Sequence, residues 1–490
     1  MSQKYTYQKE KLPIPVIEGM DELVELYYKT WEIAFKNIDY INLPGWKNIL
    51  TCMPGVGKTW LWDSCIMAFI TNYSNGTLSA LNNLDNFYML QREDGYISMA
   101  YKIEDGEPAF GERINPPLLA WCEWRSYQVT GDKDRIARIL PHLEGMFDFI
   151  EKNRKRGGTP LYWFEDAGSS GMDNSPRAGY AAWQLHGSDV CFVDLAAQQA
   201  MSAKYIALMH KTLGNIEKQT FYEAENKRIC NLINTLHWSD KSRFYYDLFA
   251  RSGPNEKPKY INTKTAAAFW TMLAGAARGR YLEGMVEHLF NEDEFYTKVP
   301  FASLSRDDLN YDKTGGYWLG GVWPPTNLAA IEGLCEAGRT ELARDAAFRY
   351  LKAICEVDKD PVYGGIWECY APEAYKPSTR EEGILVKCDF VGWGGLAPIT
   401  MLIENIIGLT FSADENTVNF NLSPSRRVGL CNMLFNGGMV SVVCKEYSSF
   451  KNETVIETEA EKPFLLRVIT KNYPEGYVAD IPVGRYELKL

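Results

Sequence analysis

The chain has 490 residues, of which 46% are hydrophobic and 13% aromatic, so it can bury a large core and is not disordered. Its 52 basic and 63 acidic residues give a formal net charge of −11. This acidic balance argues against DNA, RNA or an anionic membrane as the main partner, because binding to those partners needs clustered Lys and Arg. A neutral small molecule or an oligosaccharide is compatible with the charge.

Targeting and membrane signals are missing from the sequence. The first residues contain no apolar segment of the kind found in signal peptides. The small apolar stretch at 266–277 is too short to span a bilayer, and the run at 398–409 is interrupted by Glu404 and Asn405. We therefore expect a soluble, cytoplasmic protein.

Cysteine and histidine usage predicts a reduced protein without a metal centre. The eleven cysteines are scattered, with no Cys-x-x-Cys pair, which is typical of buried, reduced thiols. The five histidines form no His-Glu-x-x-His motif and no close pair, which argues against a zinc site. No EF-hand loop is present either. We expect no metal and no cofactor, and the sequence carries no signal for a particular oligomeric state.

Helical periodicity dominates the first four-fifths of the chain. Apolar side chains recur at three-to-four spacing over 20–38, and 134–151 repeats the pattern behind Asp132 or Asp134, either of which can cap the helix. Similar stretches predict further helices at 57–72, 116–129, 190–213, 215–236, 265–289, 325–337, 339–356 and 393–408.

The pattern changes after Leu409. Short runs rich in β-branched and aromatic residues are separated by turn signals such as Asn436-Gly437-Gly438. These runs predict strands at Val418–Leu422, Cys431–Leu434, Met439–Cys444, Thr454–Thr458, Phe464–Ile469 and Tyr486–Leu490. We expect a helical catalytic domain over residues 1–410 and a small antiparallel β-sandwich over residues 411–490.

The connections suggest how the helical part is organised. A large helical body with long, aromatic, Gly-rich loops favours a toroid of paired helices, in which the loops meet at one end and form a pocket. Periodicity alone also allows an irregular bundle. No internal sequence repeat is visible, which argues against a solenoid.

The segment Met53–Thr59 ends like a phosphate-binding loop but lacks the full motif. The pattern Gly-x-x-x-x-Gly-Lys-[Ser/Thr] requires glycine at position 52, which is Cys52. No Rossmann-like unit surrounds the segment. We interpret it as a loop that leads into a helix, and we reject nucleotide binding.

Five loops combine Trp or acidic residues with glycines, a composition that suits sugar binding. Indole faces stack on the C–H faces of sugar rings, carboxylates and Asn bond to hydroxyls, and glycine lets the backbone approach closely. The same aromatic residues are also typical of a packed core. The loops are Trp60–Ser64, Gly168–Arg177, Gly315–Pro325, Tyr363–Tyr370 and Asp389–Gly395.

Glycoside hydrolysis needs two carboxyl groups that flank the scissile bond, one protonated and one ionised. The candidates in or beside these loops are Asp63, Asp166, Asp173, Glu368, Glu373 and Asp389. Each also has an ordinary interpretation: Asp173 as a helix cap, turn residue or partner of Arg177, and Glu368 as a hydrogen-bonded edge residue. The residue types alone leave these alternatives open.

The order of the motifs resembles that of trehalase-like (α/α)6-barrel glycosidases, especially glycoside hydrolase family 63 and its mannosylglycerate hydrolase-like branch. The resemblance covers about residues 50–410, and Asn115–Asp132 also fits it. The segments that carry it are Trp62-Asp63-Ser64, Gly171-Met172-Asp173-Asn174-Ser175-Pro176-Arg177, Gly321-Val322-Trp323-Pro324-Pro325, Trp367–Glu373 and Phe390–Pro398.

This resemblance implies an inverting α-glycosidase with Asp173 as general acid and Glu368 as general base. In inverting enzymes the two carboxyl groups lie about 6.5–9.5 Å apart, which leaves room for a water molecule. The resemblance also implies a subsite for the terminal sugar. Its expected residues are Trp62, Asp63, Asn174, Arg177, Trp323 and Trp393, with Gln184, Trp367 and Tyr370 as further candidates.

Arg177 is a potential difficulty for this assignment. A proton donor needs a raised pKa, yet a guanidinium paired with Asp173 would lower the pKa of that carboxyl group. We therefore expect Arg177 to contact the substrate or another carboxylate instead of Asp173.

The motifs predict release of a terminal glucose or mannose from a small glycoside or a short α-linked oligosaccharide. Lys376 and Arg380 could meet an anionic leaving group, although a charged loop is commonly just solvated. The leaving-group side is expected to come from the variable loops near 35–58, 90–115, 292–316 and 371–389.

Two other classes of function stay open at this point. One is a different (α/α)6 enzyme, an epimerase or a lyase, which the scarcity of histidines and the acidic net charge disfavour. The other is a non-catalytic sugar-binding protein, which the presence of both Asp173 and Glu368 disfavours.

Overall fold

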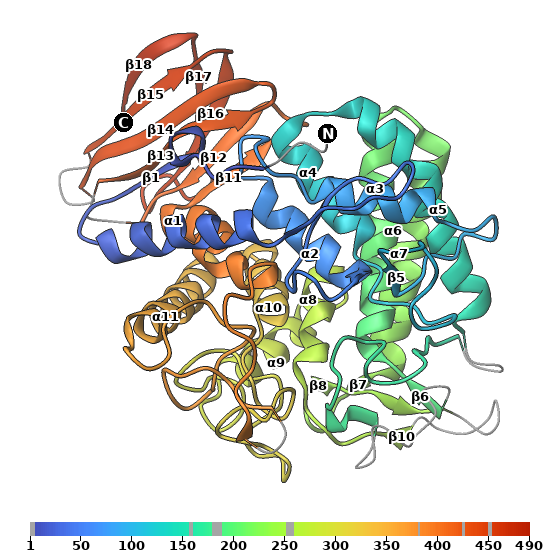
Figure 1. The fold of residues 1–490 in the computed structure, drawn as a ribbon. Helices are drawn as coiled ribbons and strands as arrows, with labels where there is room; N and C mark the ends of the chain where they lie inside the picture. Colours follow the sequence, from blue (N-terminus) through green and yellow to red (C-terminus); the bar gives the residue numbers. More distant parts are fainter. Residues whose placement is uncertain are drawn as a thin grey trace.

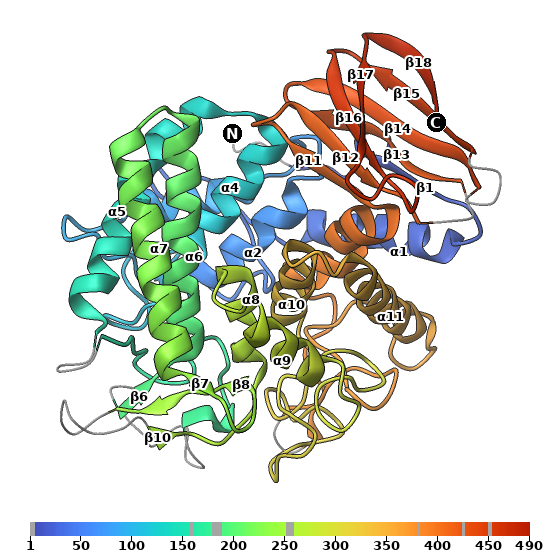
Figure 2. The ribbon, with the colours of Figure 1, turned by 180° about the vertical axis from the view of Figure 1, so that it is seen from behind.

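The computed structural model describes residues 5–155, 160–178, 189–250, 259–380, 383–423, 427–448 and 453–490. Helices make up most of the regular structure as far as Ile407, and strands dominate the rest of the chain (Figure 1). The strand-rich region lies against one end of the helical body, and the long loops gather at the opposite end (Figures 1 and 2).

The predicted helices are present with small shifts at their ends. They are α1 (Asp21–Lys36), α2 (Leu61–Thr71), α4 (Leu119–Thr130), α5 (Lys133–Asn153), α6 (Val193–Thr212), α7 (Ile216–Leu236), α10 (Pro324–Glu336) and α11 (Thr340–Lys359). A 3-10 turn (Trp393–Gly395) and the π-helical segment η7 (Leu396–Ile407) fill the range 393–408. Asp132 caps α5, since its carboxylate accepts a hydrogen bond from the Arg135 backbone N–H at 2.9 Å.

Two helical details differ from the prediction. The range 265–289 is not one helix but α8 (Trp270–Ala274), preceded by a 3-10 turn, and α9 (Arg280–Leu289). Gly275 ends α8 with a φ of 89°, a conformation that suits glycine and stops the helix. Helix α3 (Leu81–Met89) was not predicted, because its polar asparagines hide the periodicity.

Six helical elements pack in sequence around a common core. In the order α2, α4, α6, α8, α10 and η7, each element contacts the next one. Element η7 also contacts α2, so the series is closed. These elements are buried on nearly all sides, as expected for an inner layer. Helices α1, α3, α5, α7 and α11 pack outside them (Figures 1 and 2).

The C-terminal region contains two sheets. Their strands are β11 (Leu409–Ser412), β12 (Thr417–Asn421), β13 (Val428–Phe435), β14 (Gly438–Ser448), β15 (Glu453–Ala460), β16 (Phe464–Ile469), β17 (Tyr477–Ile481) and β18 (Gly484–Lys489). One sheet has the order β1-β13-β14-β15-β18 and the other β11-β12-β16-β17. Phe411 of β11 packs against Phe435 of β13, with ring centroids 5.4 Å apart, so the two sheets are in contact.

The topology of these sheets corrects the prediction of a purely antiparallel region. Strands β12 and β16 pair in parallel, because β13, β14 and β15 lie between them in the chain and belong to the other sheet. Strand β1 (Ile14–Ile17) comes from the N-terminal part of the chain and pairs antiparallel with β13. Its pairing ties the beginning of the chain to the C-terminal region.

Short strands connect the loops of the helical body. They are β2 (Ile38–Asp39), β3 (Ile49–Leu50), β4 (Lys58–Trp60), β5 (Ala100–Lys102), β6 (Val190–Cys191), β7 (Trp238–Ser239), β8 (Phe244–Tyr245), β9 (Leu248–Phe249) and β10 (Lys259–Tyr260). Strand β4, which pairs antiparallel with β5, ends directly before α2 begins.

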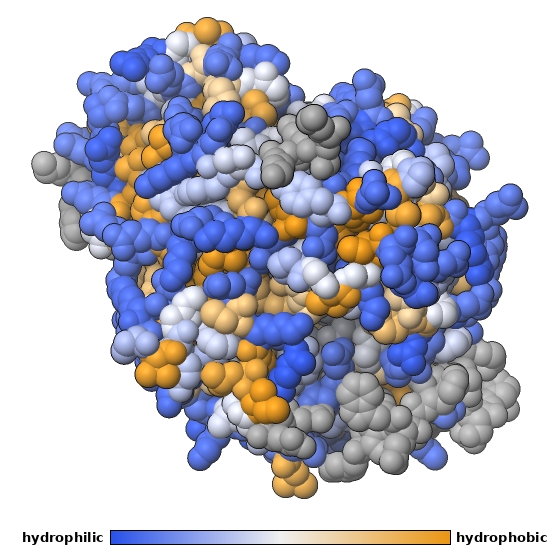
Figure 3. All heavy atoms as spheres, in the orientation of Figure 1, coloured by the Kyte–Doolittle hydropathy of each residue, from blue (hydrophilic) through white to orange (hydrophobic). Residues whose placement is uncertain are grey.

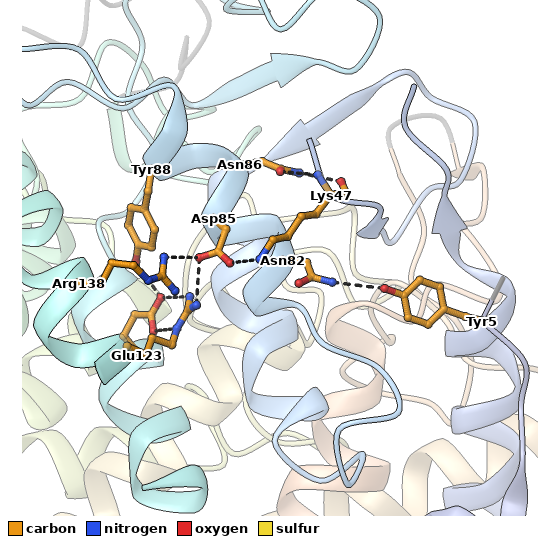
Figure 4. A network of polar contacts seen from close by, with 9 residues as sticks. Tyr5, Lys47, Asn82, Asp85, Asn86, Tyr88, Glu123 and Arg138 are labelled. Carbon is orange, nitrogen blue, oxygen red and sulfur yellow. Dashed lines mark hydrogen bonds and ion pairs between the residues drawn. The ribbon is translucent and has the colours of Figure 1, made fainter. Parts of the chain in front are cut away.

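A charged network joins α3, α4 and α5 (Figure 4). Arg135 donates to Glu123 at 2.7 Å and to Asp85 at 3.0 Å, while Tyr88 donates to Glu123 at 3.0 Å. Lys47 also pairs with Asp85, at 2.5 Å. Burial opposes the charged form of Asp85, but these cations outweigh it and lower its pKa. The network holds the outer helices to the inner ones through satisfied charges.

The helices of the described residues are too short or too polar to cross a bilayer, and on the face seen in Figure 3 hydrophobic residues occur in small groups among hydrophilic ones. The eleven cysteines are free, and all except Cys335, Cys388 and Cys431 are buried, as expected for mostly buried thiols.

Candidate active site

The glycine-rich loops meet at the end of the helical body where α2, α10 and η7 begin. They enclose a cavity of about 410 Å³. Its lining residues are Met53, Val56, Trp60, Trp62, Asp63, Met99, Phe110, Arg113, Asn115, Gly168, Gly171, Asp173, Tyr317, Trp318, Trp323, Glu368, Arg380, Lys387, Phe390 and Trp393.

Six of the predicted site residues meet in this cavity: Trp62, Asp63, Asp173, Trp323, Glu368 and Trp393. Asn174, Arg177, Trp367 and Tyr370 are described by the structure but do not line it. Gln184 lies outside the described residues.

The loop that carries Asp173 is held by a tight set of hydrogen bonds. The Asp166 carboxylate accepts from the backbone N–H of Ser169 at 2.7 Å and from its hydroxyl at 3.0 Å. Arg113 pairs with the other oxygen of Asp166 at 2.7 Å. Asp166, one of the six candidate carboxylates, thus shapes the loop and does not line the cavity itself.

Arg177 anchors this loop to the helical body. Its guanidinium is fully buried and donates to both oxygens of Asp194, at 2.5 and 2.8 Å, and to both oxygens of Asp247, at 2.7 and 2.8 Å. The expectation that Arg177 contacts another carboxylate instead of Asp173 is confirmed. Its assignment to the sugar subsite is wrong, because the guanidinium is fully buried and its N–H groups bond to Asp194 and Asp247.

Removal of this anchor should destabilise the protein strongly. In an Arg177→Met variant, Asp194 and Asp247 stay buried without their cation, which costs about 3–5 kcal/mol of unfolding free energy. The measurement is urea unfolding followed by fluorescence. Arg280→Met, which removes an exposed pair with Asp240, is the control and should cost less than about 1 kcal/mol. Equal losses in the two variants would contradict the anchoring role.

Gly171 lets the loop pass beside Trp62. Its φ is +81°, and a Cβ atom there would stand 2.4 Å from the indole ring. Only glycine satisfies both conditions, so the position of Asp173 two residues later depends on it. Trp62 also contacts Trp270, with ring centroids 6.3 Å apart in an edge-to-face arrangement.

Gly171→Ala should therefore impair catalysis as well as stability. Gly214→Ala is the matched control, because Gly214 also has a positive φ, +76°, but open space around a Cβ. Both variants should lose about 1–2 kcal/mol from backbone strain. Only Gly171→Ala should also lower kcat/KM. We expect a fall of at least about tenfold, because small displacements of catalytic groups are costly. A normal kcat/KM in that variant would show that the Trp62 contact does not position the loop.

Glu368 lies between several hydrogen-bond donors. Tyr317 donates its hydroxyl to Oε1 at 2.9 Å, Arg380 donates to Oε2 at 3.2 Å, and the Lys387 backbone N–H donates to Oε2 at 3.3 Å. The Trp393 indole N–H donates to the Glu368 backbone carbonyl at 3.1 Å. The side chain is only 3% exposed. These donors stabilise a negative charge and fix the direction of the carboxylate.

Sequence analysis did not identify Tyr317, although it lies within one of the five loops. It has a φ of +66°, which is rare for a bulky residue and is characteristic of functional sites. Arg380 stacks over its ring at 4.8 Å. Burial and the Glu368 charge raise the pKa of Tyr317, so its hydroxyl stays a donor to Glu368.

The remaining carboxyl groups of the cavity have raised pKa values. Burial raises the pKa of Asp173 to about 7, and the charge of Glu368 adds to the rise against the opposing effect of Arg380. Burial also raises the pKa of Asp63 to about 7, to which Glu368 and Asp173 contribute, while a hydrogen bond with Cys52 opposes it. Both groups can therefore carry a proton near neutral pH.

Aromatic rings form one wall of the cavity. Trp318 and Trp323 stack in parallel with centroids 4.1 Å apart, and Trp393 meets Trp323 edge to face at 5.8 Å. The Trp323 indole N–H donates to the Tyr317 carbonyl at 3.1 Å. These contacts give the wall a fixed orientation, which suits the apolar face of a sugar ring.

The other predicted subsite residues support the loops from behind. Asn174 accepts from the Trp318 backbone N–H at 2.9 Å and donates to the Gly316 carbonyl at 3.0 Å, which joins two of the five loops. Trp367 donates its indole N–H to the Gly364 carbonyl at 2.6 Å, and its backbone N–H donates to the Tyr370 hydroxyl at 3.1 Å. These polar groups bond within the protein, and the three residues do not line the cavity.

Three of the four loops expected on the leaving-group side contribute to the lining. The loop near 35–58 supplies Met53 and Val56, and the loop near 371–389 supplies Arg380 and Lys387. The loop near 90–115 supplies residues that include Met99, Phe110 and Arg113. Arg380 is thus placed at the cavity, where it pairs with Glu368, whereas Lys376 is exposed and does not line it. Within the described residues no cluster of His, Cys, Asp and Glu has the arrangement of a metal site.

A family model for the mannosylglycerate hydrolase MGH1-like glycoside hydrolase domain matches residues 57–381. The chain belongs to this family. Residues Asp63, Asp173 and Glu368 all fall within the match, and the resemblance inferred from the motifs is confirmed. Membership makes the chain a glycoside hydrolase and favours hydrolysis over the epimerase, lyase and binding-protein alternatives.

This MGH1-like hydrolase is also similar to individual proteins. An uncharacterized protein of Borreliella burgdorferi is 29% identical over 452 residues, which is 87% of each chain. The mannosyl-oligosaccharide glucosidase of Saccharomyces cerevisiae is 24% identical over 241 residues, which is 46% of this chain and 26% of the yeast protein. The GH63 mannosylglycerate hydrolase of Thermus thermophilus shares the fold, with a TM-score of 0.62 and 19% identity over 77% of this chain and 100% of that chain.

Proposed function

We propose that the chain is an inverting, exo-acting α-glycosidase that releases a terminal glucose or mannose from a small glycoside or a short α-linked oligosaccharide. One observation carries the proposal: two carboxyl groups line one cavity in contrasting surroundings. Burial raises the pKa of Asp173 to about 7, whereas hydrogen-bond donors surround Glu368. The closed series of inner helices supports an (α/α)6 toroid as the scaffold.

In this mechanism Asp173 is the general acid and Glu368 the general base. Asp173 donates its proton to the glycosidic oxygen as the bond from that oxygen to the anomeric carbon breaks. Glu368 removes a proton from a water molecule, whose oxygen attacks the anomeric carbon from the opposite face. The sugar leaves with inverted configuration, and proton exchange with solvent restores both groups.

The cavity walls suit one terminal sugar. Trp323 and Trp393 offer apolar faces for the sugar C–H groups, Trp62 closes the other side beside Gly171, and Asp63 offers a carboxyl group to the hydroxyls. A cavity of about 410 Å³ lies at the lower end of the range for ligand pockets, which favours removal of single residues from a chain end. The names of the relatives, a mannosylglycerate hydrolase and a mannosyl-oligosaccharide glucosidase, support glucose or mannose.

The test is hydrolysis of a substrate panel followed by proton NMR. The panel contains aryl α-glucosides, aryl α-mannosides, mannosylglycerate and kojibiose, and spectra in the first minutes report which anomer is released. We expect the β-anomer first, from at least one α-linked substrate. Initial release of the α-anomer would contradict inversion, and no turnover of any member would contradict the substrate class.

A further inference from the structure

The charge of Arg380 is placed at the two carboxyl groups of the catalytic cavity. Arg380 lines this cavity, and its guanidinium donates to Glu368 Oε2 at 3.2 Å. The side chain of Arg380 is 40% exposed, whereas that of Glu368 is 3% exposed. The guanidinium therefore meets a buried carboxylate from the solvent side, and its charge acts on the space in which the proposed reaction takes place.

Tyr317 and the backbone fix the position of this guanidinium. The guanidinium carbon of Arg380 lies over the Tyr317 ring, 4.8 Å from its centroid. The Tyr317 backbone N–H donates to the carbonyl of Thr379, the residue before Arg380, at 2.6 Å. The Arg380 backbone N–H donates to the Ile384 carbonyl, also at 2.6 Å. Because its backbone and its planar head are both held, Arg380 is pre-organised to pair with Glu368.

The same guanidinium also acts on the proposed acid. Asp173 lines the cavity together with Glu368 and Arg380. Burial raises the pKa of Asp173 to about 7, and the Glu368 charge adds to the rise, whereas the Arg380 charge opposes it. One cation thus influences both carboxyl groups, Glu368 by a direct hydrogen bond and Asp173 by its charge.

The proposed reaction moves a negative charge from one of these carboxyl groups to the other. Asp173 gives its proton to the glycosidic oxygen as the bond from that oxygen to the anomeric carbon breaks. Glu368 takes a proton from the attacking water, whose oxygen bonds to the anomeric carbon. Glu368 is therefore ionised before this step and Asp173 after it. A cation that acted on Glu368 alone would oppose the transfer, whereas one that acts on both groups stabilises the charge at either position.

We propose that Arg380 is a positioning residue for the catalytic pair. Its guanidinium holds the Glu368 carboxylate ionised and in place, and it stays beside the negative charge as that charge passes to Asp173. It has this role instead of the recognition of an anionic leaving group, which the sequence also allowed. The inference rests on the proposed roles of Asp173 and Glu368.

The other titratable groups around the cavity do not replace Arg380 in this role. They are Asp63, Arg113, Asp166, Tyr317, Cys369 and Lys387. Arg113 is paired with Asp166 at 2.7 Å, and Lys387 is exposed, so water and salt screen its charge. Burial raises the pKa of the phenol and of the thiol, which stay neutral. The pKa of Asp63 is raised to about 7, so Asp63 titrates in the same range as Asp173.

The pH dependence of kcat/KM in Arg380 variants tests the proposal. Arg380→Met and Arg380→Gln remove the charge, and the glutamine keeps a hydrogen-bond donor. Both limbs of the profile should move to higher pH in these variants, the ascending limb by about one pH unit, because a cation beside a carboxyl group favours its ionised form. The ratio of variant to wild-type kcat/KM should therefore increase with pH. Arg380→Lys keeps the charge, so its limbs should stay near the wild-type positions.

Arg306→Met is the matched control. Arg306 pairs with Glu373 at 3.1 Å and does not line the cavity, so its removal should leave both limbs in place. Unmoved limbs in both neutral Arg380 variants would overturn the proposal even if kcat fell, since a merely structural residue has that effect. Movement of the ascending limb alone would also overturn it, because Arg380 would then act on Glu368 only.

A pair of substrates distinguishes this role from leaving-group recognition. Wild type and Arg380→Met are compared on a phenyl α-glycoside and on the 4-carboxyphenyl α-glycoside of the same sugar. We expect the same fold-loss of kcat/KM on both. A loss confined to the carboxylated substrate would overturn the proposal and assign Arg380 to the leaving group.

The variants of the two carboxyl groups show which inference fails. If Asp173→Asn and Glu368→Gln keep the wild-type rate and profile, the proposed function fails and this inference fails with it. If both residues prove essential while the Arg380 variants keep the wild-type limbs, only the role of Arg380 is overturned.

Discussion

Replacement of Asp173 with asparagine should lower kcat on an unactivated α-glycoside by about 10³-fold, because the amide cannot protonate the leaving oxygen in the transition state. The shape of the side chain is preserved, so substrate binding and KM should change little. Initial rates and thermal melting of the same preparation separate loss of catalysis from loss of folding. Asp389→Asn is the control, since Asp389 was a sequence candidate that does not line the cavity, and it should keep most of its rate.

The pH profile gives a second view of the same residue. Only the protonated form of Asp173 can act as an acid, and its pKa is raised to about 7. The wild-type rate should therefore fall as pH increases through about 7. The small residual rate of Asp173→Asn should lack this descending limb. If the descending limb persists unchanged in this variant, it belongs to another group. Asp63 would then be the candidate, because its pKa is also raised to about 7.

Replacement of Glu368 with glutamine should also lower kcat, by about 10²–10⁴-fold, because the amide cannot take a proton from the attacking water. The Tyr317 hydroxyl can still donate to the amide oxygen, so the local structure should persist. Glu373→Gln is the matched control: Glu373 accepts from Tyr311 at 2.8 Å and does not line the cavity. A small effect of Glu368→Gln, or an equal effect of Glu373→Gln, would exclude Glu368 as the base.

Added azide distinguishes a lost base from a distorted site. In Glu368→Ala, azide can enter the space of the carboxylate and attack the anomeric carbon without base assistance. We expect a faster reaction that yields a glycosyl azide of inverted configuration. Asp173→Asn should gain much less from azide, since its limiting step is departure of an unprotonated leaving group. Mass spectrometry and NMR identify the product.

Local patterns in the sequence were sufficient for most of the fold. The apolar repeat of α5 begins close to the capping Asp132 in the sequence, and the structure contains both the helix and the cap. Pairings between distant segments could not be predicted in this way. Strand β1 joins β13 across about 400 residues of chain, and β12 meets β16 in parallel because three strands of the other sheet intervene.

The same limit applies to the site. Motif order placed Asp173 and Glu368, which meet in one cavity although they are far apart in the chain. Residue type did not show on which side of its backbone each side chain lies. Arg177 turns away from the cavity towards Asp247, 70 positions along the chain, and Asn174 bonds to Trp318, 144 positions along. Tyr317 lies in one of the five loops, but its hydrogen bond to Glu368 and its unusual φ are visible only in the structure.

The central claim, that Asp173 supplies a proton while Glu368 activates water, is tested most directly by varying the leaving group. Rates of Asp173→Asn and Glu368→Gln are compared on an α-glycosyl fluoride and on the corresponding methyl α-glycoside. Fluoride departs with little help from an acid. We expect Asp173→Asn to recover much of the wild-type rate on the fluoride only, and Glu368→Gln to remain slow on both. Equal impairment of Asp173→Asn on the two substrates, or recovery of Glu368→Gln on the fluoride, would contradict these roles.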